Sequence, residues 1–216
     1  MENYNDYVIK DGKYIGKFEE MYKKFDNPWN QTSKEYHKNS YSRNTAIINI
    51  RRYKINSLVE FGCGLGYYTS LLAQETGIKI LGVDISHTAI TKAKKLWPDL
   101  NFAVDSVINI RHYTDYEAIL FAEIAWYILN DLDKIFDDML KYFPGKYFIH
   151  NLVFYKGQQK YGNEYFTNLK EFINYIPFKL IAYSEATEEF DDIETSTIFK
   201  IEKKCSHDLL KQSKTK

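Results

Sequence analysis

The chain has 216 residues, enough for one domain in which helices cover both faces of a full sheet. Its 29 lysines and arginines balance 29 aspartates and glutamates, and this zero net charge argues against a dedicated nucleic-acid binder. Two cysteines, Cys63 and Cys205, make no disulfide framework, and no Cys/His cluster has zinc spacing. No signal peptide and no apolar run of membrane-spanning length is evident, so we expect a cytoplasmic protein without nucleic-acid or membrane partners.

The sequence of residues 7–53 predicts short elements rather than a sheet. Residues 7–16 carry Asp11-Gly12 at their centre, which is compatible with a small hairpin or, equally, with a mobile arm. Apolar side chains at helical spacing predict a helix over residues 18–25, and a proline shortly afterwards ends it. A second helical region, in one piece or two, is predicted over residues 33–53.

From residue 57 onward, short apolar runs alternate with helical patterns, which is typical of a parallel sheet covered by helices. The predicted strands span residues 57–61, 79–83, 101–104, 117–122, 146–154, 178–184 and 195–202. The predicted helices span residues 67–76, 87–96, 131–142 and 167–175. The acidic stretch 185–194 is too long for a tight hairpin, and residues 204–216 are expected to be a disordered tail. We interpret Lys92, Lys94 and Lys95 as the solvated face of their helix.

A glycine turn, Gly62-x-Gly64-x-Gly66, joins the first of these strands to the first helix. Such a turn places a helix N-terminus, with its positive dipole end, at the carboxyl edge of the sheet. The dinucleotide fingerprint G-x-G-x-x-G would need a third glycine where Tyr67 stands, and Glu60 precedes the turn. A pyrophosphate does not favour a carboxylate at that strand tip, whereas a cationic ligand does.

Acidic residues also end the next two strands. Asp84 follows the turn at close to the spacing of a carboxylate that binds ribose hydroxyls, and Asp105 ends the third strand. Together with Glu60-x-Gly62-x-Gly64-x-Gly66, this order resembles the class I S-adenosylmethionine (SAM) methyltransferases over residues 58–140. The resemblance implies a doubly wound, Rossmann-like α/β fold whose seven-stranded sheet is mostly parallel, with the last strand antiparallel. It also implies an N-terminal arm and helical lid over residues 1–54 and a SAM-binding core over residues 55–203.

The same resemblance assigns roles to individual residues. It implies that Asp84 chelates the SAM ribose and that Asp105 holds the adenine amine. The Asn-Pro-Trp turn and the Tyr-Ser-Arg helix are similar to the lid of NodS-like sugar N-methyltransferases, which implies that Trp29 and Tyr41 stack near the site and that Arg43 pairs with the SAM carboxylate. A core tryptophan and a solvated arginine are the alternatives. The full set of expected cofactor-binding residues is Glu60, Gly62, Gly64, Gly66, Asp84, Ile85, Asp105, Ser106, Ala122, Trp29, Tyr41 and Arg43.

Two residues near the carboxyl ends of the fourth and fifth strands are catalytic candidates, namely Glu123 and His150. A hydroxyl acceptor needs a base that takes its proton, whereas an amine needs only to be held unprotonated. Histidine has the better unperturbed pKa for a base, about 6.5. The alternatives are a core histidine for His150 and a contact to the SAM amino group for Glu123. No metal ligand set is expected.

The sequence therefore predicts a SAM-dependent methyltransferase that acts on an oxygen or nitrogen of a small polar acceptor, with a saccharide or its derivative favoured. The Asn-Pro-Pro-Tyr signature of enzymes that methylate amino groups of DNA and proteins is missing from residues 122–125, which argues against a nucleobase acceptor. Two other functions stay open: a nicotinamide-dinucleotide-dependent oxidoreductase and a non-catalytic SAM-binding regulatory protein.

Overall fold

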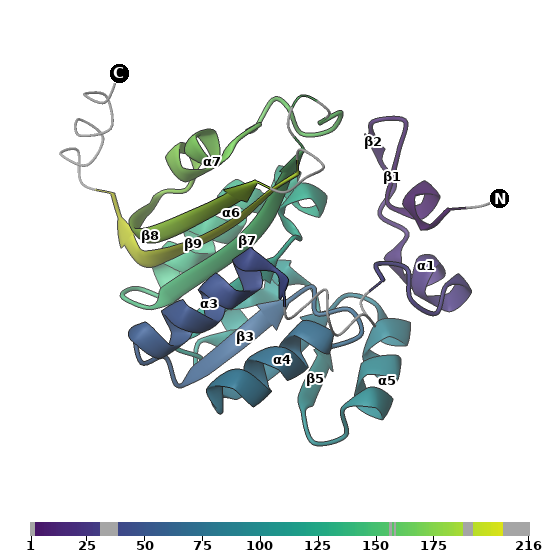
Figure 1. Cartoon of the computed structure of the whole chain (residues 1–216), viewed down its shortest axis with the longest axis horizontal. Helices are drawn as coiled ribbons and strands as arrows, with labels where there is room; N and C mark the ends of the chain where they lie inside the picture. The colour runs from purple at the N-terminus through teal and green to yellow at the C-terminus, as the bar shows by residue number, and fades with distance from the viewer. Residues whose placement is uncertain (1–2, 31–38, 156, 158, 188–191, 205–216) are drawn as a thin grey trace.

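The computed structural model describes residues 3–30, 39–155, 157, 159–187 and 192–204. Its centre is a seven-stranded sheet in the order β5-β4-β3-β6-β7-β9-β8 (Figure 1). The strands are β3 (Ser57–Phe61), β4 (Lys79–Asp84), β5 (Asn101–Val104), β6 (Ala118–Ala122), β7 (Tyr147–Tyr155), β8 (Phe178–Thr187) and β9 (Asp192–Lys203). Strand β9 pairs antiparallel with both neighbours, while β3 to β7 pair in parallel. The predicted fold class is confirmed.

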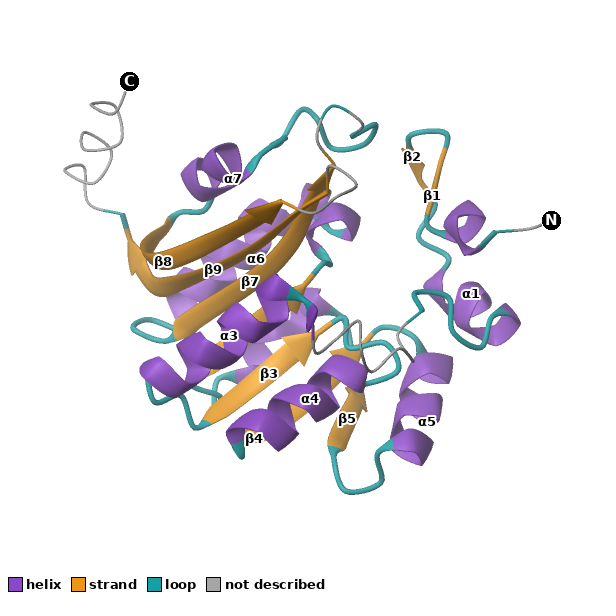
Figure 2. Cartoon of the chain, viewed as in Figure 1, coloured by secondary structure: helices purple, strands orange, loops and turns teal. Residues whose placement is uncertain are grey.

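Helices cover both faces of this sheet (Figure 2). One face carries α3 (Tyr41–Arg52), α4 (Tyr67–Thr76) and α5 (His87–Leu96). The other carries α6 (Leu132–Tyr142), α7 (Leu169–Tyr175) and the 3-10 helix η2 (Val107–Tyr113). Side chains alternate between the two cores along each strand: Leu58 packs with the α3–α4 side, and Val59 and Phe61 pack with the α6–α7 side.

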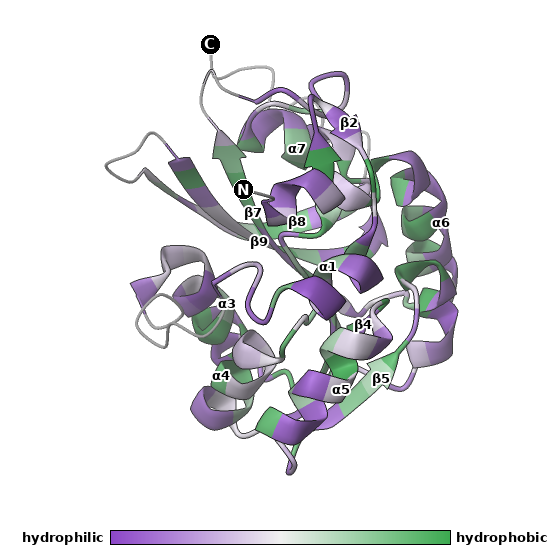
Figure 3. Cartoon of the chain, turned by 90° about the vertical axis from the view of Figure 1, so that its right-hand side faces the viewer, coloured by the Kyte–Doolittle hydropathy of each residue, from purple (hydrophilic) through white to green (hydrophobic). Residues whose placement is uncertain are grey.

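Residues 3–30, here called the N-terminal segment, lie at the carboxyl edge of the parallel strands (Figure 1). Figure 3 looks onto this edge and shows α1 (Phe18–Lys24) in front of the sheet. The segment also contains the 3-10 helix η1 (Tyr4–Tyr7) and the hairpin of β1 (Ile9–Lys10) and β2 (Lys13–Tyr14). Asp11 and Gly12 turn this hairpin with φ angles of 51° and 71°, so the hairpin prediction is confirmed.

Most predicted elements occur within a few residues of their expected bounds, but the acidic stretch 185–194 is a correction. Strands β8 and β9 pair as far as Thr187 and Ile193, so the two ends of the stretch that we expected to separate the strands belong to the strands themselves. Polar side chains line these strands because β8 is the edge of the sheet. Two short 3-10 helices, η3 (Ala125–Tyr127) and η4 (Leu129–Asp131), follow β6.

The boundaries predicted at residues 54 and 203 stay a prediction, although α3 packs on β9 and α4 as part of the cover of the sheet. Residues 33–38 of the predicted helical region and residues 205–216 of the expected tail lie outside the described residues. None of the described helices combines the length and the apolar character that a membrane crossing requires.

Gly62 offers a test of how closely the tips of β3 and β6 approach each other. Its φ is 78°, and an added Cβ would lie 2.0 Å from Cγ2 of Ile124. We expect Gly62→Ala to lower the free energy of unfolding by about 3 kcal/mol, because it combines a strained backbone with overlap in a packed region. Gly77→Ala is the matched control: its φ is 68° but nothing lies near, and we expect a loss of about 1 kcal/mol.

Urea denaturation of both variants gives the comparison. Adding Ile124→Ala to Gly62→Ala should restore part of the lost stability, because it removes the atom that the new methyl group meets. Equal losses at the two glycines would contradict the close approach.

Candidate functional site

The glycine turn between β3 and α4 is held against the tip of β4. The N–H of Gly62 donates to the carbonyl of Val83 at 2.8 Å. The N–H of Gly64 donates to one carboxylate oxygen of Asp84 at 2.9 Å, and the N–H of Ser86 donates to the other at 2.8 Å. Burial raises the pKa of Asp84, and these backbone hydrogen bonds act in the opposite direction. One carboxylate therefore fixes the turn and the start of α5 together.

Glu60, near the tip of β3, is buried, and its carboxyl accepts a hydrogen bond from the hydroxyl of Thr69 at 2.6 Å. Burial raises the pKa of Glu60 to about 7, although the Thr69 hydroxyl and the positive charge of Arg43 act to lower it. A carboxyl group with this pKa is divided between its two protonation states near neutral pH. A cation that reached it would favour the ionised state.

Arg43, in the first turn of α3, is 7% exposed, so it is not a solvated surface charge. Its Nη2 lies 3.3 Å from Oε1 of Glu123, which follows β6, and its guanidinium stands 5.1 Å from the centre of the Tyr68 ring. The hydroxyl of Tyr68 accepts a hydrogen bond from Asn151 at 3.0 Å. Four elements, α3, α4, β6 and β7, thus meet around one buried cation.

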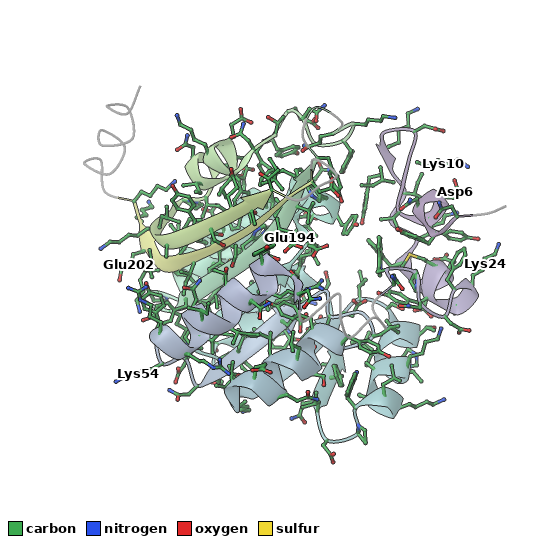
Figure 4. The ribbon with its side chains drawn as sticks, viewed as in Figure 1. Asp6, Lys10, Lys24, Lys54, Glu194 and Glu202 are labelled. Carbon is green, nitrogen blue, oxygen red and sulfur yellow. The ribbon has the colours of Figure 1, made fainter. Side chains whose placement is uncertain are left out.

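Glu194 of β9 anchors the N-terminus of α3. Its Oε2 accepts hydrogen bonds from the hydroxyl of Ser40 at 2.7 Å and from the N–H of Ser42 at 2.9 Å. Ser40 is the N-cap, and its hydroxyl in turn accepts from the N–H of Arg43 at 3.3 Å. Figure 4 shows Glu194 in the interior near the start of α3, whereas Glu202 lies at the outer end of β9. The carboxylate complements the positive end of the helix and fixes Arg43 indirectly.

Asp105 follows β5 and accepts three hydrogen bonds from its own neighbourhood. One oxygen accepts from the N–H of Ser106 and from the amide of Asn109, both at 2.7 Å, and the other accepts from the hydroxyl of Tyr113 at 2.9 Å. Partial burial alone would raise the pKa of Asp105, but the side-chain and backbone hydrogen bonds outweigh it and lower the pKa. The acid is therefore a rigid, ionised group.

A cavity of about 700 Å³ lies at this edge of the sheet, between the strand tips and the N-terminal segment. Its lining includes ten of the fourteen residues that the sequence singled out: Trp29, Arg43, Glu60, Gly62, Asp84, Ile85, Asp105, Ser106, Ala122 and Glu123. The structure thus brings the acids of four strand tips and one arginine around a common space. A cavity of this size suits a small ligand together with part of a second one.

The other four predicted site residues do not line the cavity. Gly64 and Gly66 are buried in the turn, and Tyr41 is 60% exposed. His150 is 2% exposed within β7, its ring centre lies 4.3 Å from that of Phe172 on α7, and burial lowers its pKa to about 3. Such a histidine stays neutral in the core, so its position gives no support to the hypothesis that it is a base.

The N-terminal segment is fixed across the cavity by reciprocal helix capping. Glu19 of α1 accepts hydrogen bonds from the hydroxyls of Ser86 and Thr88, both at 2.7 Å, at the N-terminus of α5. Lys92 of α5 donates to the carbonyl of Tyr22 at 2.9 Å, near the C-terminus of α1. Each helix end therefore meets a charge of the opposite sign. Lys92 is a correction, because it was interpreted as part of a solvated face.

Several functional contacts were missed by the sequence analysis. Tyr68 and Thr69 lie in the first turn of α4, directly after the glycine turn. This position next to the glycines was the sequence signal that could have identified them. Asn151 follows His150 in β7 and was not among the predicted site residues. The contacts of Glu19 and Glu194 join segments far apart in the chain, and no local pattern marks them.

Known proteins are similar to this chain in two respects. Residues 58–143 match the model of a family described as a methyltransferase domain. The fold is similar to that of the N-methyltransferase NodS from Bradyrhizobium japonicum WM9 in complex with S-adenosyl-L-homocysteine (SAH), with 16% identity and a TM-score of 0.62 over 82% of this chain and 92% of that one. No curated protein sequence matches the chain significantly.

Two further solved structures share the fold. The PH0226 protein from Pyrococcus horikoshii OT3 is 15% identical, with a TM-score of 0.65 over 84% of this chain and 98% of that one. The methyltransferase domain of bacterial CtHen1 is 17% identical, with a TM-score of 0.59 over 73% and 96%.

The docking of α1 on α5 gives a testable prediction. Burial would raise the pKa of Glu19, but the hydrogen bonds from Ser86, Thr88 and Lys23 lower it to about 2. Its stabilising effect is therefore present above the ordinary glutamate value of 4.5 and is lost as the pH falls toward 2. We expect Glu19→Gln to weaken docking by about 1–2 kcal/mol near neutral pH.

Hydrogen exchange measured by mass spectrometry checks this. Peptides covering α1 should exchange about tenfold faster in Glu19→Gln, while peptides from β3 and β6 keep their protection. Glu20→Gln, on the same helix and exposed, is the matched control and should match the wild type. Uniform loss of protection throughout the sheet would instead make Glu19 a general stability residue.

Proposed function

We propose that this chain, whose residues 58–143 match the model of a methyltransferase domain, is a SAM-dependent methyltransferase that methylates an oxygen or nitrogen of a small polar acceptor. A saccharide or saccharide derivative is the first acceptor class to test, and a cytoplasmic location is part of the proposal. The observation that carries the proposal is the set of strand-tip acids and one buried arginine around a single cavity.

The chemistry of these side chains fits the cofactor. SAM offers an ammonium group, a sulfonium, a carboxylate, two ribose hydroxyls and an adenine amine. Glu60 is a buried carboxyl group with a pKa of about 7, so its surroundings supply too little positive charge to keep it fully ionised near neutral pH. The ammonium group of SAM would supply that charge. In the proposal Arg43 holds the carboxylate, Asp84 the ribose hydroxyls and Asp105 the adenine amine.

The cofactor supplies a methyl group already activated by a positively charged sulfur. What this chain contributes is position. The strand tips hold one reactant against the sheet, and the N-terminal segment lines the opposite side of the cavity. Alignment of this kind is worth roughly 7–11 kcal/mol in favourable intramolecular reactions. We place the acceptor beside Glu123, because Glu123 is not among the side chains assigned to the cofactor.

Isothermal titration with SAH is the experiment that tests the proposal first. We expect the wild type to bind SAH and Asp84→Asn to bind at least about tenfold more weakly, since one of two ribose-binding oxygens becomes an amide. Asp99→Asn is a matched control, because Asp99 is exposed and does not line the cavity. Binding of NADH in place of SAH would favour the oxidoreductase. SAH binding without turnover of any acceptor would favour the regulatory protein.

The pH dependence of SAM binding tests Glu60 separately. Only the ionised carboxylate attracts the ammonium group, so below its pKa of about 7 the affinity should fall as the pH falls, by up to about tenfold per pH unit. Above that value the affinity should level off, and binding near pH 7 should release a proton. Glu60→Gln should bind weakly with little pH dependence while keeping the hydrogen bond from Thr69.

Titrations in two buffers with different heats of ionisation measure the released proton directly. An unchanged pH dependence in Glu60→Gln would show that the titrating group is another residue of the site.

A further inference from the structure

Six aromatic side chains form a continuous surface on the acceptor side of the cavity, here called the aromatic wall. They come from the N-terminal segment, from η3 after β6 and from the loop after β7. All of them line the cavity: Tyr4, Tyr14, Phe18, Trp29, Tyr127 and Tyr161.

Successive rings of the wall touch one another. From Tyr4 the contacts run to Trp29 at 5.0 Å and on to Tyr127 at 6.0 Å between ring centres. Tyr127 then meets Phe18 at 5.2 Å, which lies 6.5 Å from Tyr14. Tyr14 stacks on Tyr161 of the loop after β7 at 6.4 Å, where Figure 1 shows the β1–β2 hairpin beside that loop. Aromatic faces carry partial negative charge and attract cations.

Of the charged groups beside the wall, Glu123 favours a cation. Among the described lining residues, Glu123 and Lys160 are the charged side chains outside the set assigned to the cofactor. Lys160 is exposed, whereas the side chain of Glu123 is 37% exposed. Oε1 of Glu123 pairs with Arg43, which leaves Oε2 for a ligand. Glu123 also has a φ of 63°, unusual for a non-glycine residue, and such strain is typical of functional positions.

The described lining offers one carboxylate outside the set assigned to the cofactor, Glu123, to take a proton from the acceptor. It contains no histidine, and burial raises the pKa of Tyr14, Tyr127 and Tyr161, so none of them is a phenolate. The pKa of a hydroxyl group lies near that of water, about 15.7. An ammonium group loses its proton near pKa ~10, so a carboxylate takes a proton far more readily from an ammonium group than from a hydroxyl.

We propose that the acceptor is an amine, whose nitrogen is held between the aromatic wall and the carboxylate of Glu123. This inference rests on the proposed methyltransferase function and narrows its acceptor from oxygen or nitrogen to nitrogen. The wall binds the protonated amine through ring faces, and Glu123 accepts a hydrogen bond from its N–H.

Methyl transfer to the amine conserves atoms and charge. The ammonium form gives one proton to Glu123 or to solvent, and the nitrogen lone pair forms the new N–C bond. The C–S bond breaks with its electron pair on sulfur, which becomes the neutral thioether of SAH. The methylated amine carries the positive charge, so the wall and Glu123 hold a cation again.

The wall is tested with two probes of the same shape. Choline is a cation, and 3,3-dimethylbutan-1-ol is its neutral carbon analogue. In the SAH-saturated protein, tryptophan fluorescence from Trp29 and Trp126 reports binding, since both line the cavity. We expect choline to bind about tenfold more tightly than the neutral probe, which corresponds to ~1.4 kcal/mol.

Two variants assign that preference to the proposed groups. Glu123→Gln removes the charge, and Tyr127→Leu removes the central ring of the wall; each should bring the two probes within about twofold of each other. Glu123→Gly suits the positive φ and keeps the fold, so its loss of preference could not come from misfolding. Tyr183→Leu is the matched control, because Tyr183 is 61% exposed and lies outside the cavity.

Turnover gives the second readout, with release of SAH measured for acceptors that share a skeleton: benzylamine against benzyl alcohol and glucosamine against glucose. We expect methylation of the amine members alone. Equal affinity for the two probes in the wild type, a preference that survives both variants, or methylation of a hydroxyl member would overturn the inference. If SAH itself does not bind, the proposed function fails, and the failure is separate from that of the aromatic wall.

Discussion

A chain of hydrogen bonds runs from the glycine turn through Asp84 and Ser86 to Glu19, and the shape of the cavity depends on it. Asp84 holds the turn with one oxygen and the start of α5 with the other. The hydroxyl of Ser86, the N-cap of α5, then donates to Glu19 of the N-terminal segment. The floor and the cover of the site are therefore parts of one network, and a ligand that alters Asp84 acts on both.

Two other groups at the cavity, Glu60 and Glu123, carry an unfavourable free energy that their immediate neighbours do not fully offset. Glu60 is buried with a pKa of about 7, and Glu123 holds a backbone conformation that costs of order 1 kcal/mol. Buried charge and strained backbone lower stability unless a ligand or a neighbouring group offsets them. The packed cores on both faces of the sheet supply that offset, which lets the strand tips keep chemistry that a core would exclude.

The fold followed from the sequence because periodicity and glycines mark parallel strands and the helices between them, and the tips of such strands must meet at one edge. That rule placed Glu60, Asp84 and Asp105 correctly around one cavity. It could not decide between His150 and its neighbour, since adjacent residues of a strand face opposite sides: Asn151 reaches Tyr68, and His150 points into the other core. Contacts between distant segments, such as that of Glu19 with α5, leave no local pattern at all.

The anchoring of α3 by Glu194 has a consequence for biosynthesis. Arg43 leaves the ribosome early, but the carboxylate that fixes its helix comes about 150 residues later in β9, which pairs between β7 and β8. A nascent chain therefore holds the acids of the strand tips well before its arginine has a fixed place. In the proposed site, Arg43 gains its fixed position only when β9 enters the sheet, so an incompletely synthesised chain leaves the lining of the cavity incomplete.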